Sequence, residues 1–181
     1  MTMNLPNKLT IFRVILIPFF VICMLVPAIP FNNIIACVIF CVASFTDFLD
    51  GYLARRDGLV TNFGKFMDPL ADKLLVGSAL ICLVETGQLP AWAVVLIISR
   101  EFIISGFRLI ASDNGVVIAA SYWGKSKTVV QMVMVIFLIL NFQGAILGVI
   151  GRLLMWAAVI LTVVSLVDYI VKNKDVLKDT K

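Results

Sequence analysis

Four aspartates have the residue type and the spacing for chemistry in an otherwise apolar sequence. Asp47 and Asp50 stand in "TDFLDGYLARR", and Asp68 and Asp72 stand in "GKFMDPLAD". Residues three or four positions apart share a face of an α-helix, so each stretch predicts a helix with one acidic face. Acidic residues are costly inside a membrane, and they commonly mark functional sites there.

Small residues accompany the acids on the same two faces. Gly51 and Ala54 follow the first pair at helical spacing, while Gly64 and Ala71 flank members of the second pair. Side chains this small leave space beside the carboxylates and let a ligand approach the helix backbone. The pattern therefore predicts room for a bound group larger than a proton.

The acids also match one another in depth. A helix rises about 1.5 Å per residue, so Asp50 and Asp68 lie about 6 to 7 Å from the helix ends joined by the segment 56–63, and Asp47 and Asp72 lie about 12 Å from them. This short segment contains turn-forming residues, so we expect the two helices to be antiparallel neighbours. Four carboxylates are thus predicted to meet just beneath the lipid headgroups.

Two interpretations of this acidic cluster are open. Four neighbouring anions repel one another, so cations must neutralise them. Arg55 and Lys73 could do so in a purely structural, salt-bridged contact between helices. Alternatively, the all-oxygen donor set holds one or two hard divalent cations such as Mg²⁺, Mn²⁺ or Ca²⁺. Two such ions stabilise charge on a phosphodiester or diphosphate, which predicts a phosphate-bearing lipid as the substrate.

The absence of histidine restricts other kinds of chemistry. Without it, the commonest general base and the histidine-containing zinc sites are excluded. The four cysteines lack the CxxC spacing of metal and redox motifs, so we expect Cys23, Cys37, Cys41 and Cys82 to be small core residues.

Length and composition indicate a membrane protein that crosses the bilayer several times. The 181 residues are 61% hydrophobic and 14% charged, which is far from the composition of a soluble domain. We predict an all-α membrane protein with a single domain over residues 1–181. Its six transmembrane helices are expected near 9–29, 33–55, 64–85, 89–111, 128–142 with its flanks, and 148–171.

Positive charge is distributed unevenly over the two ends of these spans. Of the 15 Lys and Arg residues, Lys73 and Arg100 fall within spans and Arg152 falls near one face, whereas the other 12 fall at the opposite face. Cytoplasmic flanks are enriched in Lys and Arg, so both termini and the acidic cluster are predicted to be cytoplasmic. The net charge of +4 reflects this topology and attraction to anionic lipids, and it indicates no nucleic-acid partner.

The complete spacing resembles the signature of the CDP-alcohol phosphatidyltransferases. The eight matching residues, spread over 26 positions, are Asp47, Asp50, Gly51, Ala54, Arg55, Gly64, Asp68 and Asp72. The resemblance implies six transmembrane helices, a homodimer and bound divalent metal, usually Mg²⁺ or Mn²⁺ and as a pair of ions. It also implies a reaction in which an alcohol hydroxyl displaces CMP from a CDP-activated lipid.

The resemblance carries roles onto individual residues. The implied metal ligands are Asp47, Asp50, Asp68 and Asp72. Asp72 would also be the catalytic base that takes the proton of the acceptor hydroxyl. The residues implied to contact the CDP-lipid are Gly51, Ala54, Arg55 and Gly64, together with Asn7 and Thr10 near the amino terminus.

Three further stretches, "LPNKLTIFRVILIP", "SREFIISGFR" and "WGKSKTVVQ", resemble one branch of that family. This branch transfers the phosphatidyl group of CDP-diacylglycerol to sn-glycerol 3-phosphate and gives phosphatidylglycerophosphate. An acceptor that carries a phosphate dianion needs cations, and Arg108, Lys125 and Lys127 with the hydroxyl of Thr128 are expected to bind it. The two lysines are equally consistent with a role as cytoplasmic anchors.

Three other ionisable residues lie within the expected spans. Arg13 in the first span is expected to extend its side chain to the membrane interface. Arg100 and Glu101 lie deeper, where the adjacent pair either serves helix packing or stabilises the pocket. Neither of these two residues is predicted to be catalytic.

Other functions remain open at this point. The same chemistry could use inositol phosphate, serine or phosphatidylglycerol as the acceptor. A divalent-cation or proton-coupled transporter could use the same four acids, although transporters often have polar residues near the membrane midplane rather than at one face. A non-catalytic assembly protein would leave the paired acids unexplained. The charge-asymmetric form indicates a bacterial inner membrane, with a mitochondrial membrane as the alternative.

Overall fold

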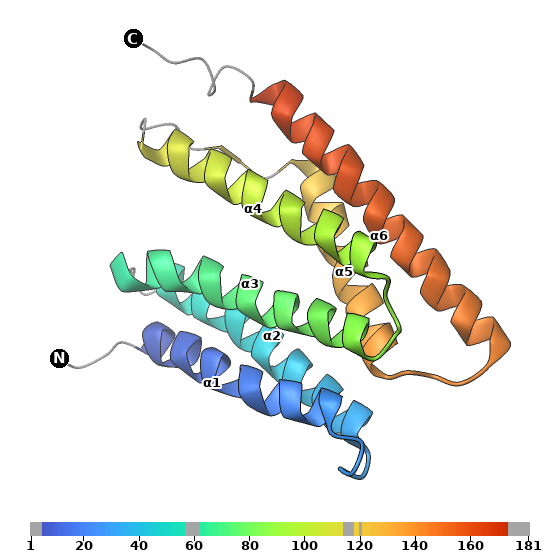
Figure 1. The fold of residues 1–181 in the computed structure, drawn as a ribbon. Coiled ribbons are helices and arrows are strands. Elements are labelled where there is room, and N and C mark those ends of the chain that lie inside the picture. The colour runs from blue at the N-terminus through green and yellow to red at the C-terminus, as the bar shows by residue number, and fades with distance from the viewer. Residues whose placement is uncertain (1–4, 57–61, 114–117, 120, 174–181) are drawn as a thin grey trace. The chain divides into compact units, whose positions relative to one another are not determined.

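The computed structural model describes residues 5–56, 62–113, 118–119 and 121–173, which form six helices and no strand (Figure 1). The helices are α1 (Leu5–Leu25), α2 (Asn32–Arg56), α3 (Asn62–Glu85), α4 (Ala91–Asp113), α5 (Tyr122–Ile139) and α6 (Ala145–Lys172). The prediction of an all-helical protein is therefore confirmed.

Each expected span coincides with one helix, and the largest differences in bounds are at α1 and α5. α1 begins at Leu5 and ends at Leu25, whereas the span was expected at 9–29; α5 begins at Tyr122 rather than at 128. The expected bounds of the spans were based only on where the apolar runs begin and end. Polar residues such as Lys8 and Lys125 continue these two helices, because helix formation does not require an apolar side chain.

The helices divide between two compact units. In the first unit, α1 packs against both α2 and α3, and α2 also contacts α3. In the second unit, which holds α4, most of α5 and α6, the main packing is between α4 and α6. The expectation of a single domain over the whole chain stays a prediction.

Contacts along the helices give their relative directions in the first unit. Arg13 of α1 contacts Asp47 of α2, and further along α1 the ring of Phe20 lies 5.9 Å from that of Phe40. Higher residue numbers on α1 therefore lie beside lower residue numbers on α2, so these two helices are antiparallel. Thr10, near the start of α1, contacts Asp68, near the start of α3. Figure 1 shows α1 and α3 running in the same direction, so α2 and α3 are antiparallel neighbours, as predicted.

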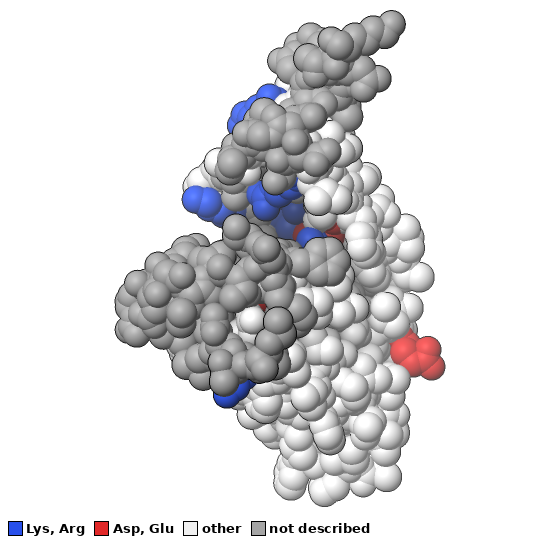
Figure 2. All heavy atoms as spheres, turned by 90° about the vertical axis from the view of Figure 1, so that its left-hand side faces the viewer, with Lys and Arg blue, Asp and Glu red and all other residues white. Residues whose placement is uncertain are grey.

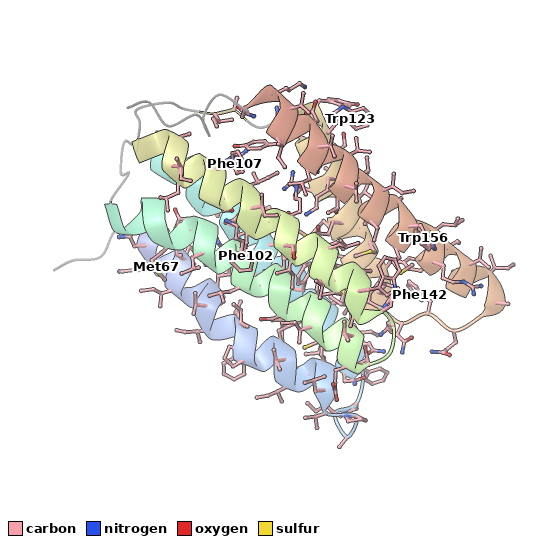
Figure 3. The ribbon with its side chains drawn as sticks, turned by 45° about the horizontal axis from the view of Figure 1, so that its top comes forward. Met67, Phe102, Phe107, Trp123, Phe142 and Trp156 are labelled. Atoms are coloured by element: carbon pink, nitrogen blue, oxygen red, sulfur yellow. The ribbon has the colours of Figure 1, made fainter. Side chains whose placement is uncertain are left out.

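Ring contacts give the direction of packing in the second unit. The rings of Trp92 and Trp156 lie 5.5 Å apart, and those of Phe107 and Tyr169 lie 6.0 Å apart. Phe107 and Trp156 mark the two ends of this contact between α4 and α6 (Figure 3). Residue numbers increase together along both helices, so α4 and α6 are parallel. When consecutive helices cross a membrane in alternating directions, each helix is parallel to the next but one, as α4 is to α6.

Large apolar side chains are exposed on all six helices. Examples are Phe19 on α1, Phe45 on α2, Ile81 on α3, Phe102 on α4, Val129 on α5 and Leu153 on α6. On the face that Figure 2 shows, most of the described surface is formed by residues other than Lys, Arg, Asp and Glu. An apolar surface this extensive is a liability in water and is the normal exterior of a protein in lipid.

Among the residues that the structure describes, two helices are long and apolar enough to cross a membrane by length and composition: α1, from Asn7 to Leu25, and α6. The apolar part of α2, Asn32–Asp47, is shorter. Ionisable residues such as Arg100 and Glu101 interrupt the apolar character of the other helices. Together with the exposed side chains, these features indicate a membrane protein, whereas the number of spans stays a prediction.

The cysteines only partly match their predicted place in the core. Cys37 and Cys82 are buried and Cys23 is partly buried, but Cys41 is exposed, so the prediction was wrong for Cys41. Cys41 lies on the face of α2 that also exposes Val38 and Phe45, because these positions recur at helical spacing. All four are free thiols.

The connection between α3 and α4 explains where both helices stop and start. The amide of Gly87 donates to the carbonyl of Val84 at 3.0 Å, and the amide of Gln88 donates to that of Leu83 at 2.9 Å. This pair of bonds is a Schellman end, which needs a left-handed residue; Gly87 supplies it with φ of 73°. Pro90 then begins the first turn of α4.

Candidate active site

Two aspartates of the acidic motif are bound by one buried face of α1. A guanidinium nitrogen of Arg13 donates to Oδ1 of Asp47 at 2.6 Å. Three residues earlier on α1, the hydroxyl of Thr10 donates to Oδ1 of Asp68, also at 2.6 Å. Both donor residues are 0% exposed. Side chains from α2 and α3 that are distant in sequence are thus held by donors one helical turn apart.

The prediction for Arg13 was wrong. Its side chain is fully buried and ion-paired with Asp47, whose own side chain is 38% exposed, instead of extending to the membrane interface. The helix surface on which Arg13 lies faces α2, where the Asp47 carboxylate lies within hydrogen-bond distance of the guanidinium. Removing a guanidinium from water is expensive, and an ionised carboxylate with good geometry offsets that cost.

Asp72 lies one turn beyond Asp68 on the continuous helix α3, and both side chains are partly buried. The predicted sharing of one helix face by Asp68 and Asp72 is confirmed by this helix. Likewise, α2 is continuous through Asp47 and Asp50. The predicted residues Asp50, Gly51, Ala54, Arg55 and Gly64 lie outside the residues whose side chains the structure describes.

A complete metal-ligand set is not found among the side chains that the structure describes: no three His, Cys, Asp or Glu residues there form a group that could hold an ion. Asp50, one of the four expected ligands, is not among those side chains. The assignment of Asp47, Asp50, Asp68 and Asp72 as metal ligands therefore stays a prediction.

A second polar cluster lies inside the other unit, around Glu101 of α4. The ammonium of Lys127 on α5 donates to Oε1 of Glu101, and Arg100 donates to the same oxygen at 3.1 Å. Arg100 also donates through Nε to the hydroxyl of Ser165 on α6, at 3.1 Å. One carboxylate and its two cations thus connect three helices, with Lys127 only 1% exposed.

The predicted acceptor-binding residues differ in exposure. Arg108, Lys125 and Thr128 are exposed, whereas Lys127 is buried against Glu101. The hydroxyl of Thr128 donates to the backbone carbonyl of Gly124 at 3.0 Å. Their role in binding a phosphate stays a prediction.

Close packing brings α5 to the side chain of Arg100. A Cβ atom added at Gly124 would lie 3.3 Å from a guanidinium nitrogen of Arg100 and 3.5 Å from the hydroxyl of Ser121. Gly124 therefore lets the start of α5 approach the buried guanidinium. For Arg100 and Glu101, the expected role in helix packing agrees with these contacts.

Residues 3–164 match the family model described as CDP-alcohol phosphatidyltransferase. The chain belongs to the CDP-alcohol phosphatidyltransferase family. A relative from Bacillus subtilis (strain 168) is 47% identical, covering 97% of each chain. A relative from Haemophilus influenzae is 42% identical, covering 99% of this chain and 98% of the relative. A relative from Rickettsia bellii is 38% identical, covering 92% of this chain and 93% of the relative. All three relatives are named CDP-diacylglycerol–glycerol-3-phosphate 3-phosphatidyltransferase.

Membership of the CDP-alcohol phosphatidyltransferase family helps to decide between the functions that the sequence left open. The family resemblance drawn from the eight-residue motif is confirmed, and it favours a transferase over a cation transporter or an assembly protein. The family match spans helices α1 to α5 and most of α6. The acidic motif therefore lies within the matched region, as do Arg100, Glu101 and Lys127 of the second cluster.

Sequence reasoning missed contacts within this CDP-alcohol phosphatidyltransferase, among them the bond from Arg13 to Asp47. Asn7, Thr10 and Arg13 recur every three residues on an apolar helix, and all three are buried. A polar row at this spacing indicates a face that packs against polar partners instead of lipid. The predicted contact of Asn7 and Thr10 with the CDP-lipid stays a prediction.

Proposed function

We propose that this protein transfers the phosphatidyl group of CDP-diacylglycerol to sn-glycerol 3-phosphate, giving phosphatidylglycerophosphate and CMP. The proposal is carried by the similarity, at 47% identity over 97% of the chain, to a protein named for this activity. The eight-residue motif and the hydrogen bonds from buried donors on α1 to the carboxylates of Asp47 and Asp68 support the same chemistry.

The residues present fit a divalent cation by the chemistry of their donors. The motif offers only carboxylate oxygens, and hard ions such as Mg²⁺ and Mn²⁺ prefer this ligand type. In the proposal, Asp47, Asp50, Asp68 and Asp72 hold a pair of these ions. When bound, such ions neutralise phosphate oxygens and stabilise charge on the leaving group.

The proposed transfer forms one bond to phosphorus, breaks another and moves one proton. The acceptor hydroxyl oxygen forms a bond to the phosphorus that carries the diacylglycerol, and the bond from this phosphorus to the CMP oxygen breaks. Asp72 takes the hydroxyl proton, and CMP leaves with the electron pair of the broken bond. A carboxylate is a weak base for an alcohol, so its position next to the acceptor hydroxyl decides whether the transfer is efficient.

Substrate binding is assigned to two groups of residues. The CDP-lipid is proposed to contact Asn7, Thr10, Gly51, Ala54, Arg55 and Gly64, and the acceptor phosphate is proposed to contact Arg108, Lys125, Lys127 and Thr128. Three cations and a hydroxyl suit a phosphate dianion better than an uncharged acceptor.

The proposal places a single domain in the bacterial inner membrane as a homodimer with six spans, cytoplasmic termini and a cytoplasmic active site. Parallel α1 and α3, parallel α4 and α6, and apolar side chains exposed on all six helices support such a topology. The uneven distribution of Lys and Arg supports the orientation.

Release of CMP by the full-length protein in lipid nanodiscs tests the function. We expect CMP release to require both CDP-diacylglycerol and glycerol 3-phosphate, and Asp72→Asn to abolish it. Inositol phosphate, serine and phosphatidylglycerol serve as competing acceptors in the same assay. A preference for serine, or CMP release that does not depend on any acceptor, would contradict the proposal.

A further inference from the structure

We infer that Thr10 and Arg13 are positioning residues, which orient the carboxylates of Asp68 and Asp47 for metal binding. The inference rests on the proposed metal-dependent function. It assigns α1, which carries none of the motif's acids, the task of setting the geometry of carboxylates on α2 and α3.

The two hydrogen bonds have the form expected of such a role. Each donor contacts one oxygen of its carboxylate, Oδ1, at 2.6 Å. A carboxylate has two oxygens and about four acceptor sites, so one bond restricts the rotation of the group and leaves acceptor capacity for a cation. In metal sites generally, hydrogen bonds to the metal ligands orient those ligands, and their loss weakens metal binding.

Charge neutralisation alone does not explain the pair of contacts. Arg13 contributes one positive charge next to Asp47, and a purely structural ion pair would account for that contact. Thr10 carries no charge, yet its fully buried hydroxyl makes the equivalent bond to Asp68. A neutral hydroxyl can orient a carboxylate but cannot neutralise it, so orientation is the property that the two contacts share.

The geometry of α1 makes the two contacts interdependent. Thr10 and Arg13 are separated by three residues on a continuous helix that packs against both α2 and α3. Side chains at this spacing project from the same helix face. α1 therefore spaces the two carboxylates relative to each other, and a shift of this helix would move both.

Binding of Mn²⁺ to the full-length protein in nanodiscs without substrates, measured by electron paramagnetic resonance, tests the inference. Thr10→Val removes the hydroxyl at nearly constant shape, and Thr10→Ser retains it. We expect the Val variant to bind Mn²⁺ about 10- to 100-fold more weakly and the Ser variant to bind it like the wild type. The matched control is Thr162→Val, which removes another buried hydroxyl, one bonded to the carbonyl of Ala158 at 2.7 Å.

A second variant addresses Arg13. Arg13→Lys keeps the positive charge but loses the planar array of donors, so weaker Mn²⁺ binding with little change in melting temperature would support orientation as its role. Mn²⁺ binding equal to that of the wild type would reduce Arg13 to a countercharge and overturn its part of the inference.

The outcomes distinguish this inference from the proposed function. Unchanged Mn²⁺ binding by Thr10→Val with a raised KM for CDP-diacylglycerol would overturn the positioning role and favour direct contact with the nucleotide. Absence of Mn²⁺ binding by the wild type would overturn the inference outright. Wild-type protein that binds Mn²⁺ with the expected dependence on Thr10, yet releases no CMP, would support the inference and contradict the proposed function.

Discussion

The buried Lys127 and the partly buried Glu101 form an ion pair that joins α5 to α4. Lys127 was expected to bind the acceptor phosphate, and Glu101 was expected to serve packing or support the pocket. The same carboxylate oxygen accepts a bond from Arg100, which in turn reaches Ser165. Glu101 therefore determines how much positive charge of this cluster remains available to an anion.

Substitution of Glu101 by Gln should destabilise the protein strongly. The change preserves the shape of the side chain but removes the negative charge that two buried cations share. Breaking a buried ion pair on one side costs roughly 3 kcal/mol or more, because the remaining charge stays out of water. Thermal unfolding in detergent measures the loss. Glu85→Gln, at an exposed position at the end of α3, is the matched control and should leave the melting temperature nearly unchanged.

A double variant separates the ion pair from other effects of Glu101. If the pair is the cause, Glu101→Gln combined with Lys127→Gln should lose less stability than the sum of the single changes. Strictly additive losses would contradict a direct coupling between these two residues.

Substitution of Asp47 by Asn should affect both stability and activity. The amide that replaces the carboxylate lacks the charge that faces the fully buried guanidinium of Arg13, so we expect a loss of about 1 to 3 kcal/mol in the free energy of unfolding. CMP release should fall to background, because a proposed metal ligand is removed. A variant with wild-type melting temperature and no activity would show that Arg13 does not depend on this carboxylate for stability.

Replacement of Gly124 by Ala tests the close approach of α5 to Arg100. The added Cβ would lie 3.3 Å from Nη2 of Arg100, whose guanidinium group is held by hydrogen bonds from Nε and Nη1. Crowding of this kind costs about 1 kcal/mol or more, which offsets the gain in helix propensity. Gly77→Ala is the control, since nothing lies within 4 Å of a Cβ there. The Gly124 variant should melt at a lower temperature than the Gly77 variant, and the reverse order would contradict this packing.

The helices and the acidic faces could be predicted from the sequence because both depend on local spacing. Apolar runs predicted all six helices, and the separation of Asp68 from Asp72 predicted their common face on α3. Helix bounds were less accurate at α1 and α5, where polar residues extend the helix beyond the apolar run.

Partners distant in the sequence could not be predicted in this way. Arg13 near a span end is compatible with the membrane interface or with a buried carboxylate, and only the packing of α1 against α2 decides between them. Lys127 likewise fits a cytoplasmic anchor, a phosphate ligand or a buried ion pair. Its partner lies 26 positions away, on a different helix. Side-chain direction around a helix, rather than residue type, makes these distinctions.

Removal of divalent metal should abolish CMP release reversibly. Dialysis against a chelator removes the cations that the carboxylate oxygens are proposed to hold, and without them the four acids repel one another. Activity should return on addition of Mg²⁺ or Mn²⁺. The melting temperature should also rise with added Mn²⁺, because a ligand that binds the folded state stabilises it by mass action. CMP release that survives exhaustive chelation would contradict a metal-dependent mechanism.

Accessibility of single cysteines to a membrane-impermeant thiol reagent tests the proposed six spans. In a variant with Cys23, Cys37, Cys41 and Cys82 replaced by Ser or Ala, a cysteine is introduced at either Thr86 or Lys125. Both positions are exposed, the first just after α3 and the second in the first turn of α5. Odd-numbered helices leave the cytoplasm in the proposed topology, so the cysteine at 86 should react in intact cells. The cysteine at 125 should react only after permeabilisation, because Lys125 belongs to the positively charged cytoplasmic side. Equal labelling of both positions in intact cells would require an even number of crossings between them and would contradict the proposed path of α4.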